Sequence, residues 1–276
     1  MKTHISIAIA SSLLLGIVAT SCKNKNDKQE GKDSIKNVVT KPVPGTPIKY
    51  DSSKRYIYLT WDDAPQPPGS NICKRVFLEQ GVKATFFMVG MHQTDNRRKY
   101  FVDSIRNGYP QFLLANHSYS HGFQNKYSSF YSRPDSAVKD FLRAQQELNI
   151  PVKIIRLPGN PTWAFNGVLK GPKSTLPTAK MLDSLGFSLV GWDVEWEFIG
   201  GNKPKQGATA LANSVNEKLD NGNTYEPNCI VILAHDRMFA KKEYTDSLTK
   251  FITELKKDPR NVFETIDHYP SIQNRK

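Results

Sequence analysis

Two histidines four residues apart, His117 and His121, could hold a metal ion together. They belong to the sequence NHSYSHG at residues 116–122, and the whole chain contains 6 histidines. Residues i and i+4 project from the same side of one helical turn, and zinc commonly binds His nitrogen together with a carboxylate oxygen. Ser118 stands where a metalloprotease helix requires Glu, so this pair needs a third ligand from elsewhere in the chain. The alternative is that both histidines are polar side chains on an exposed turn.

The elements that would position such ligands alternate between strands and helices. Runs of β-branched and aromatic residues predict strands at 56–61, 84–89, 112–115, 153–157, 187–192, 230–234 and 262–266. Helical patterns separate these runs, which favours parallel strands joined by helical crossovers. We therefore expect an α/β fold, a distorted seven-stranded (β/α) barrel that forms a single domain.

In such barrels the chemistry gathers at the C-terminal ends of the strands. The polar residues at or just after predicted strand ends are Asp62, Asp63, His117, His121, Arg156, the segment 192–197, His235 and Asp236. Unrelated polar residues would not be expected to share this placement, so the pattern indicates one site. For the acidic pair taken alone, a solvated turn after a strand would be the preferred interpretation.

The N-terminal residues have the pattern of an export signal. Lys2 precedes an apolar run at 5–18, and small residues follow it before Cys22. The run is too short for a good membrane-spanning helix. Residues 1–21 are therefore predicted to be a signal peptide, and the small residues before Cys22 resemble the lipobox of bacterial lipoproteins. That resemblance implies an exported protein, lipid-anchored through Cys22 to a bacterial envelope membrane on its periplasmic or cell-surface side. An ordinary signal peptide cut near Ser21 is the alternative.

The next segment, residues 22–52, is polar and lysine-rich and contains several prolines near its end. Such a composition cannot bury a core, so we expect a flexible tether before a folded domain at 53–276. The formal net charge is +12, but no basic cluster interleaved with aromatic residues indicates nucleic-acid binding. We interpret the charge as a solvated basic surface, with anionic cell-wall polymers or membrane surfaces as the alternative partners. Cys73 and Cys229 could form a disulfide in an oxidising compartment or remain buried thiols.

Four short motifs resemble those of the polysaccharide deacetylases of the NodB-homology type, also called carbohydrate esterase family 4. TWDDA at 60–64 resembles the family's TFDDG, and HSYSH at 117–121 resembles its H-[ST]-x-x-H. RLP at 156–158 resembles its R-x-P, and LAH at 233–235 resembles its L-x-H. Each motif alone is weak, but four in the family's order are specific. The resemblance implies a distorted (β/α) barrel, in agreement with the alternation of strands and helices.

The resemblance further implies a metal-dependent hydrolase that removes N- or O-acetyl groups from a carbohydrate polymer or oligosaccharide of the cell envelope. Asp63, His117 and His121 would hold one divalent metal ion, with zinc preferred and cobalt or nickel as alternatives, because N/O sites bind all three. Three protein ligands leave an open position for water and substrate, as a catalytic site requires.

The resemblance also implies catalytic roles for four further groups. Asp62 would be the general base, and Arg156 would pair with Asp62, lower its pKa and fix its rotamer. His235 would be the general acid that protonates the leaving group. The oxyanion would be held by the metal and by a backbone N–H after Pro158. We expect Glu197 to be the carboxylate that tunes His235, with Asp193 and Glu195 as alternatives.

Substrate contacts are expected from Leu233, which would line the acetyl pocket, and from Gly159, Trp163 and Trp192. Gly159 departs from the family pattern, which has an aromatic residue there, so the sequence predicts that the aromatic wall of the groove is lost. Aromatic residues in two long connections, 123–133 and 159–177, would either stack on sugar rings or pack their own loops.

Two other hypotheses compete with an active deacetylase. A glycan-binding lipoprotein with a decayed site is favoured by Gly159 and by the blurred motif at 192–198. A different metal-dependent C–N hydrolase would keep the site and change the substrate.

Overall fold

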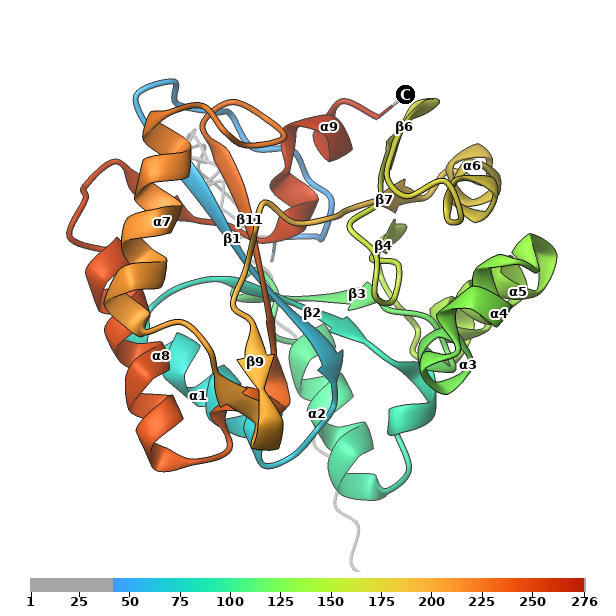
Figure 1. Cartoon of the computed structure of the whole chain (residues 1–276), viewed down its shortest axis with the longest axis horizontal. Helices are drawn as coiled ribbons and strands as arrows, with labels where there is room; N and C mark the ends of the chain where they lie inside the picture. The colour runs from blue at the N-terminus through green and yellow to red at the C-terminus, as the bar shows by residue number, and fades with distance from the viewer. Residues whose placement is uncertain (1–41, 276) are drawn as a thin grey trace, which may run out of the picture. The chain divides into compact units, whose positions relative to one another are not determined.

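The strands of the protein, seen in a computed structural model that describes residues 42–275, form one curled and mostly parallel sheet (Figure 1). The hydrogen-bonded order is β6-β5-β7-β4-β3-β2-β1-β11-β8, and β12 also pairs with β1. These strands are β1 (Arg55–Ala64), β2 (Ala84–Met88), β3 (Phe112–Asn116), β4 (Ile154–Ile155), β5 (Trp163–Phe165), β6 (Val168–Lys170), β7 (Ser188–Leu189), β8 (Val194–Glu195), β11 (Cys229–His235) and β12 (Asn261–Phe263). A separate antiparallel hairpin pairs β9 (Phe198–Ile199) with β10 (Lys203–Pro204).

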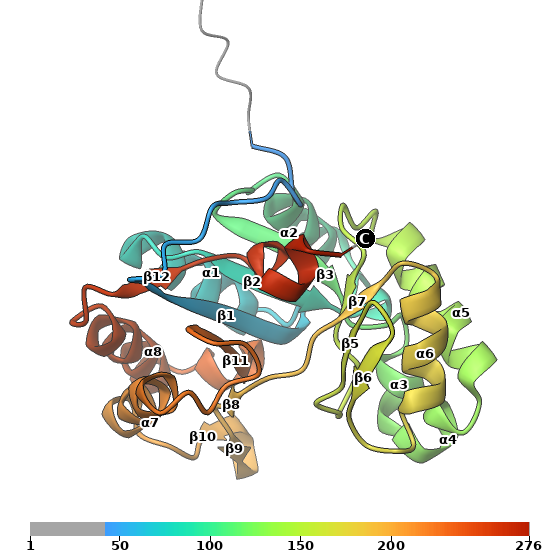
Figure 2. The same cartoon turned by 90° about the horizontal axis from the view of Figure 1, so that it is seen from above.

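The predicted fold class is confirmed, and each of the seven predicted strands is present. The sheet contains three further strands, because the antiparallel hairpin β5–β6 adds to one edge and β8 pairs with β11. With β6 and β8 at its two ends, the sheet curls into a half-barrel (Figure 2).

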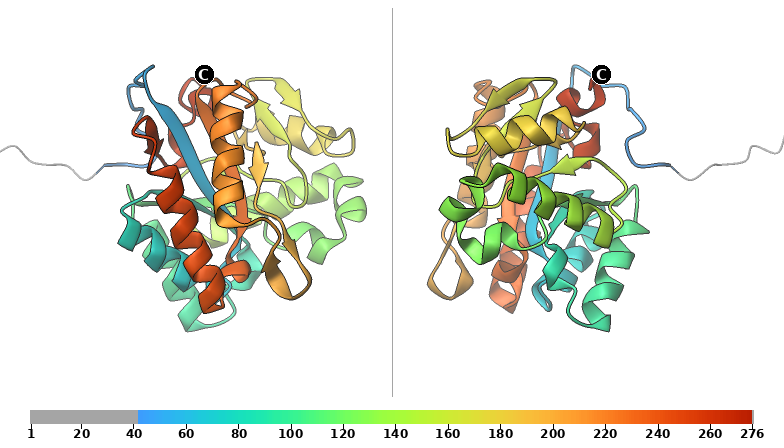
Figure 3. Two further views of the ribbon diagram at one scale, coloured as in Figure 1. Left: turned by 60° about the vertical axis from the view of Figure 1, so that its left-hand side comes forward. Right: turned by 90° about the vertical axis from the view of Figure 1, so that its right-hand side faces the viewer.

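Helices pack around the curled sheet (Figure 2). They are α1 (Gly69–Gln80), α2 (Asn96–Arg106), α3 (His121–Asn125), α4 (Tyr127–Tyr131), α5 (Pro134–Glu147), α6 (Leu176–Ser184), α7 (Ala208–Asp220), α8 (Lys242–Leu255) and α9 (Pro270–Gln273). Helices α7 and α8 pack side by side on one flank, and α4, α5 and α6 pack on the other (Figure 3). Within residues 42–275, no helix is both long enough and apolar enough to span a membrane.

Strand β1 is the centre of the fold, and all ten of its residues are buried. It pairs with β11 along one edge, and with β12 and then β2 along the other. A strand covered on both faces must be apolar along its length, which explains the run Tyr56–Trp61. The run ends in two acidic residues, Asp62 and Asp63, at the C-terminal end of the strand.

The apolar core has two parts. The larger cluster joins β1, β2 and β11 to α1, α2, α7 and α8. A smaller cluster lies beneath α4, α5 and α6 and includes Phe130 and Tyr131. Cys73 and Cys229 are free buried thiols, so the disulfide alternative is not realised in the structure.

The described end of the predicted tether packs on the domain. The Gly45 amide donates to Asp267 (2.8 Å), and Tyr50 contributes its ring to the larger core cluster. Residues 42–52 are thus not a free linker, because aromatic and backbone groups near their end find partners on the barrel. Residues 1–41, which include the predicted signal peptide and Cys22, lie outside the described residues.

We expect Ile232→Ala to lower the free energy of unfolding by about 2–5 kcal/mol, since it leaves a cavity in the core. Ile232 is fully buried on β11, between β1 and β8. The matched control is Val168→Ala on β6, whose side chain is 62% exposed and should change stability by less than about 0.5 kcal/mol. Equal denaturant midpoints for the two variants would contradict this placement of the core.

Candidate active site

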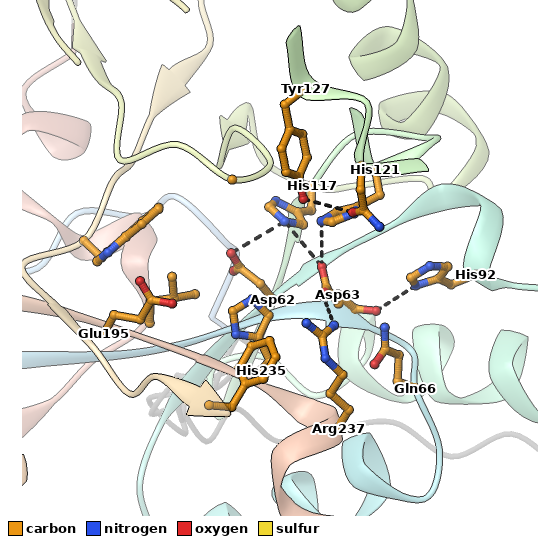
Figure 4. A pocket seen from close by; sticks show the side chains of 15 residues that line it. Asp62, Asp63, Gln66, His92, His117, His121, Tyr127, Glu195, His235 and Arg237 are labelled. Carbon is orange, nitrogen blue, oxygen red and sulfur yellow. Dashed lines mark hydrogen bonds and ion pairs between the residues drawn. The ribbon is translucent and has the colours of Figure 1, made fainter. Parts of the chain in front are cut away.

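A cavity of about 520 Å³ opens at the C-terminal ends of β1, β3 and β11 (Figure 4). Its lining consists mainly of polar and aromatic side chains, with one leucine. The lining residues are Asp62, Asp63, Gln66, His92, His117, His121, Asn125, Tyr127, Gly159, Trp192, Glu195, Phe198, Leu233, His235 and Arg237. Most of the residues singled out in the sequence therefore meet in one place.

The end of β1 brings two consecutive carboxylates to this cavity. Adjacent strand residues normally point to opposite faces. Here the pairing with β2 shifts register between Asp62 and Ala64, and Asp63 has a left-handed backbone with φ 72°. Both acidic side chains consequently face the site, although both residues are buried.

The two histidines follow β3, but they do not lie on one helical turn as the spacing suggested. Ser118 has φ 69° and His121 has φ 51°, and left-handed conformations continue through Asn125. The buried Asn116 side chain stabilises this loop, because it accepts from the Ser118 amide (2.9 Å) and donates to the Phe141 carbonyl on α5 (3.0 Å). The loop therefore depends on tertiary contacts that the spacing did not reveal.

Asp63, His117 and His121 have the geometry of a metal-ligand set. Their ligand atoms all lie within 4.8 Å of one another. The Asp63 Oδ1 atom is 3.0 Å from His121 Nε2 and 3.6 Å from His117 Nε2. This oxygen is buried and lies at ion-pair distance from both histidine nitrogens, so the three atoms converge on one point. The three residues therefore fit a divalent metal ion with N and O ligands.

The surroundings keep His117 suitable as a ligand. Its Nδ1 lies 2.9 Å from the Arg156 carbonyl, which directs Nε2 toward Asp63. Burial, together with a smaller effect of the neighbouring His121, lowers the pKa of His117 to about 3. The imidazole is thus neutral at physiological pH, the form that binds metals.

Arg156 pairs with Asp62 as predicted, through Nη1 and Oδ1 at 2.9 Å. Arg156 acts to lower the pKa of Asp62, as predicted, but it does not decide the net direction. Complete burial raises the pKa of Asp62 above its usual value, and Arg156 only partly offsets this effect. A raised pKa suits a general base, because it brings the carboxylate closer to the operating pH.

His235 ends β11 beside the two carboxylates, with a pKa lowered by burial. Its Nδ1 is buried and has no hydrogen-bond partner among the described residues. Glu197 does not line the cavity, because its carboxylate binds Lys205 (2.6 Å) and Gln206, which follow the β9–β10 hairpin. The adjacent residue, Phe198, instead places its ring edge against His235, with centroids 5.2 Å apart.

The two alternative carboxylates have different positions. Glu195 lines the cavity from β8, at its side in Figure 4. Asp193 is used structurally, since it accepts from the amides of Tyr225 and Val231, both at 2.7 Å. Glu195 is therefore the member of the trio that can contact a bound substrate.

Arg237 is a site residue that the sequence analysis missed. Its guanidinium forms an ion pair with Asp63 Oδ2 and lies 4.6 Å from the centre of the Phe198 ring. Its position in the sequence could have indicated it, since Arg237 lies two residues after His235, but none of the four family motifs includes Arg237. His92, also missed, lies with Nδ1 2.8 Å from the Asp63 carbonyl oxygen.

Three of the four predicted substrate residues, Leu233, Gly159 and Trp192, line the cavity. Trp163 does not, because it stacks on Tyr225 (centroids 4.3 Å apart) in a neighbouring cavity that also touches Trp192.

The aromatic side chain that is missing at Gly159 is replaced by the Tyr127 ring from α4. A Cβ on Gly159 would lie 2.8 Å from the Tyr127 ring, so that ring already fills the space of a side chain there. Tyr127 on α4 lines the cavity and places its ring edge-on to His121. By contrast, Phe130 and Tyr131 of the same connection are buried in the smaller core cluster.

Comparison with known families gives one match within the chain. The model of the polysaccharide deacetylase family matches residues 49–159, less than half of the 276 residues. No curated protein matches the chain.

Solved structures with this fold are numerous. A carbohydrate esterase of family 4 from Streptococcus mutans aligns with a TM-score of 0.56 at 23% identity, covering 77% of this chain and 86% of that one. A family 4 carbohydrate esterase from Streptomyces lividans, in complex with acetate, aligns with a TM-score of 0.53 at 18% identity, covering 79% and 95%. The catalytic domain of a peptidoglycan N-acetylglucosamine deacetylase from Eubacterium rectale aligns with a TM-score of 0.53 at 20% identity, covering 79% and 92%. At these identities the likeness shows the fold, and with the family model it supports the polysaccharide deacetylase family.

We expect the purified protein to bind one equivalent of a divalent metal, measured by titration of the metal-free protein. His121→Ala removes one ligand and should weaken binding by at least about 10–100-fold, the cost of losing even a supporting residue. The control is His92→Ala, which alters the same cavity outside the ligand set. Equal affinity in wild type and His121→Ala would contradict the proposed ligand set.

Proposed function

We propose that the protein is a metal-dependent hydrolase that removes N- or O-acetyl groups from an envelope glycan. The observation that carries this proposal is the convergence of buried Asp63 Oδ1 with the Nε2 atoms of His121 (3.0 Å) and His117 (3.6 Å). A second carboxylate, Asp62, and His235 line the same cavity. An acyl hydrolase needs these groups, namely a cation site, a base and an acid.

Different residues of the chain act as base, acid and oxyanion donor in the proposed reaction. A bound cation, for which zinc is our proposal, would polarise the acetyl carbonyl and acidify a water molecule. Asp62, held by Arg156, accepts the proton of the attacking water. His235 donates a proton to the leaving nitrogen or oxygen, and the backbone N–H of Gly159 supports the developing oxyanion.

The substrate proposal follows from the wall of the cavity and from the relatives. Tyr127, Trp192 and Phe198 present aromatic surface at the rim of the polar centre. The relative from Eubacterium rectale acts on N-acetylglucosamine of peptidoglycan. An acetylated glycan of this kind is the proposed substrate here, and lipid attachment through Cys22 would hold the enzyme near the envelope.

Asp62→Asn and His235→Ala should each lower kcat for acetate release by about 10²–10⁴-fold, since each removes a positioned proton-transfer group. The assay is acetate release from a panel of N- and O-acetylated glycans with metal-loaded protein. Metal content should stay at the wild-type level in both variants. Near-wild-type activity of Asp62→Asn would exclude it as the base.

A glycan-binding protein with a decayed site is the second candidate. Its specific support is Arg237, whose cation pairs with the metal ligand Asp63. This candidate predicts glycan binding without acetate release in metal-loaded wild-type protein. Acetate release that depends on Asp62 would reject it.

Cys22→Ser should move the protein from the membrane fraction to the soluble fraction of cells that express the full chain, because the lipid would have no attachment point. Fractionation followed by immunoblotting measures this, and Cys73→Ser serves as a control that leaves Cys22 in place. Retention of Cys22→Ser on membranes would contradict the lipid anchor.

A further inference from the structure

The peptide that joins Pro158 to Gly159 is held by two side chains outside the proposed catalytic set. The Tyr131 hydroxyl donates to the Pro158 carbonyl oxygen at 2.7 Å. The Asn160 side-chain amide donates to the same oxygen at 3.1 Å. Tyr131 is 3% exposed and packs against Phe130 in the smaller core cluster, so its hydroxyl has a fixed position.

The orientation of this carbonyl also determines the orientation of the next N–H. A trans peptide is planar, and its N–H points opposite to its C=O. The Gly159 N–H therefore points away from Tyr131 and Asn160, and Gly159 itself lines the cavity. Within residues 42–275 this N–H donates no hydrogen bond, so it is free to serve a bound group.

A third contact limits movement of the same segment. Gly159 has φ 67°, and the Tyr127 ring lies where its Cβ would stand. That ring also lies against Gly122, where a Cβ would come within 2.8 Å of Cδ1. The Tyr127 hydroxyl donates to Asn125 at 2.9 Å, which fixes the ring at its far end. The peptide is therefore held at its carbonyl by two donors and at the glycine by a ring.

We propose that Tyr131 and Asn160 are positioning residues that aim the Gly159 N–H as an oxyanion donor. This inference rests on the proposed deacetylase function. The positioning role of Tyr131 and Asn160 explains how the Gly159 N–H stays oriented although the family's usual aromatic residue is missing at position 159. The donor belongs to the backbone, and its direction is set by Tyr131 and Asn160 from the opposite side of the peptide.

The kinetic consequence is specific to the transition state. An oxyanion donor strengthens its hydrogen bond as negative charge develops, so misdirecting it lowers kcat more than it raises KM. Removal of one complete oxyanion donor costs about 10²–10³ in kcat. Loss of one of two supports should cost less than this, and loss of both should approach it.

The test compares Tyr131→Phe, Asn160→Ala and the double variant. Tyr131→Phe keeps the buried ring and removes only the hydroxyl, so the core packing is retained. We expect each single variant to lower kcat about threefold to tenfold and the double variant about 10²-fold, with KM within about twofold of wild type. The control is Tyr109→Phe. This change also removes a hydrogen-bonded hydroxyl, one that donates to Asp267, and Tyr109 does not line the cavity. Its kcat should not change.

A second readout does not depend on turnover. In protein labelled with ¹⁵N-glycine, the Gly159 amide resonance should shift or broaden in the double variant, while Tyr109→Phe should leave it in place. An unchanged Gly159 resonance would overturn the inference, even if wild type releases no acetate and the proposed function has failed. With active wild type, a double variant whose kcat stays within twofold would overturn the inference and leave the deacetylase function standing. A rise in KM that matches the fall in kcat would also overturn it.

Discussion

The burial of two consecutive carboxylates, Asp62 and Asp63, is the constraint on which the rest of the structure depends. A buried charge must be paired, and removing its partner typically costs about 3–5 kcal/mol. Asp62 is paired with Arg156, and Asp63 with His121 and Arg237. These partners lie in the segments that follow β4, β3 and β11, so the carboxylates tie the C-terminal edge of the sheet together. The fold and the chemistry therefore share the same contacts.

Arg156 connects the most distant parts of this network. It donates to Asp62 and also to the carbonyls of Val190 (3.2 Å) and Gly191 (2.8 Å), which follow β7. Its own carbonyl lies 2.9 Å from His117 Nδ1. One fully buried residue thus orients both the proposed base and a proposed metal ligand, and it links β1 to the strands on the far side of the half-barrel. We expect changes at this position to affect folding and catalysis together.

Backbone conformation at the site is maintained by the same packing. Asp63, Ser118 and His121 all have positive φ, which is unfavourable for residues with a Cβ. The Asn116 side chain holds Ser118 in the histidine loop, and the register shift at the end of β1 accompanies the conformation of Asp63. Unfavourable conformations of this kind persist where surrounding contacts determine them, and here they direct the ligand atoms toward one point.

The sequence by itself determined the strand order along the chain, the fold class and most of the cavity, because apolar runs and polar strand ends are local patterns. Only the tertiary structure decided which of two adjacent residues places its side chain in the site. Glu197 and Phe198 are adjacent, and a one-residue difference reverses which side of a strand a side chain faces, so Phe198 meets His235 while Glu197 binds Lys205. Likewise, the space left by Gly159 is filled by Tyr127, a residue of another element that no spacing could identify.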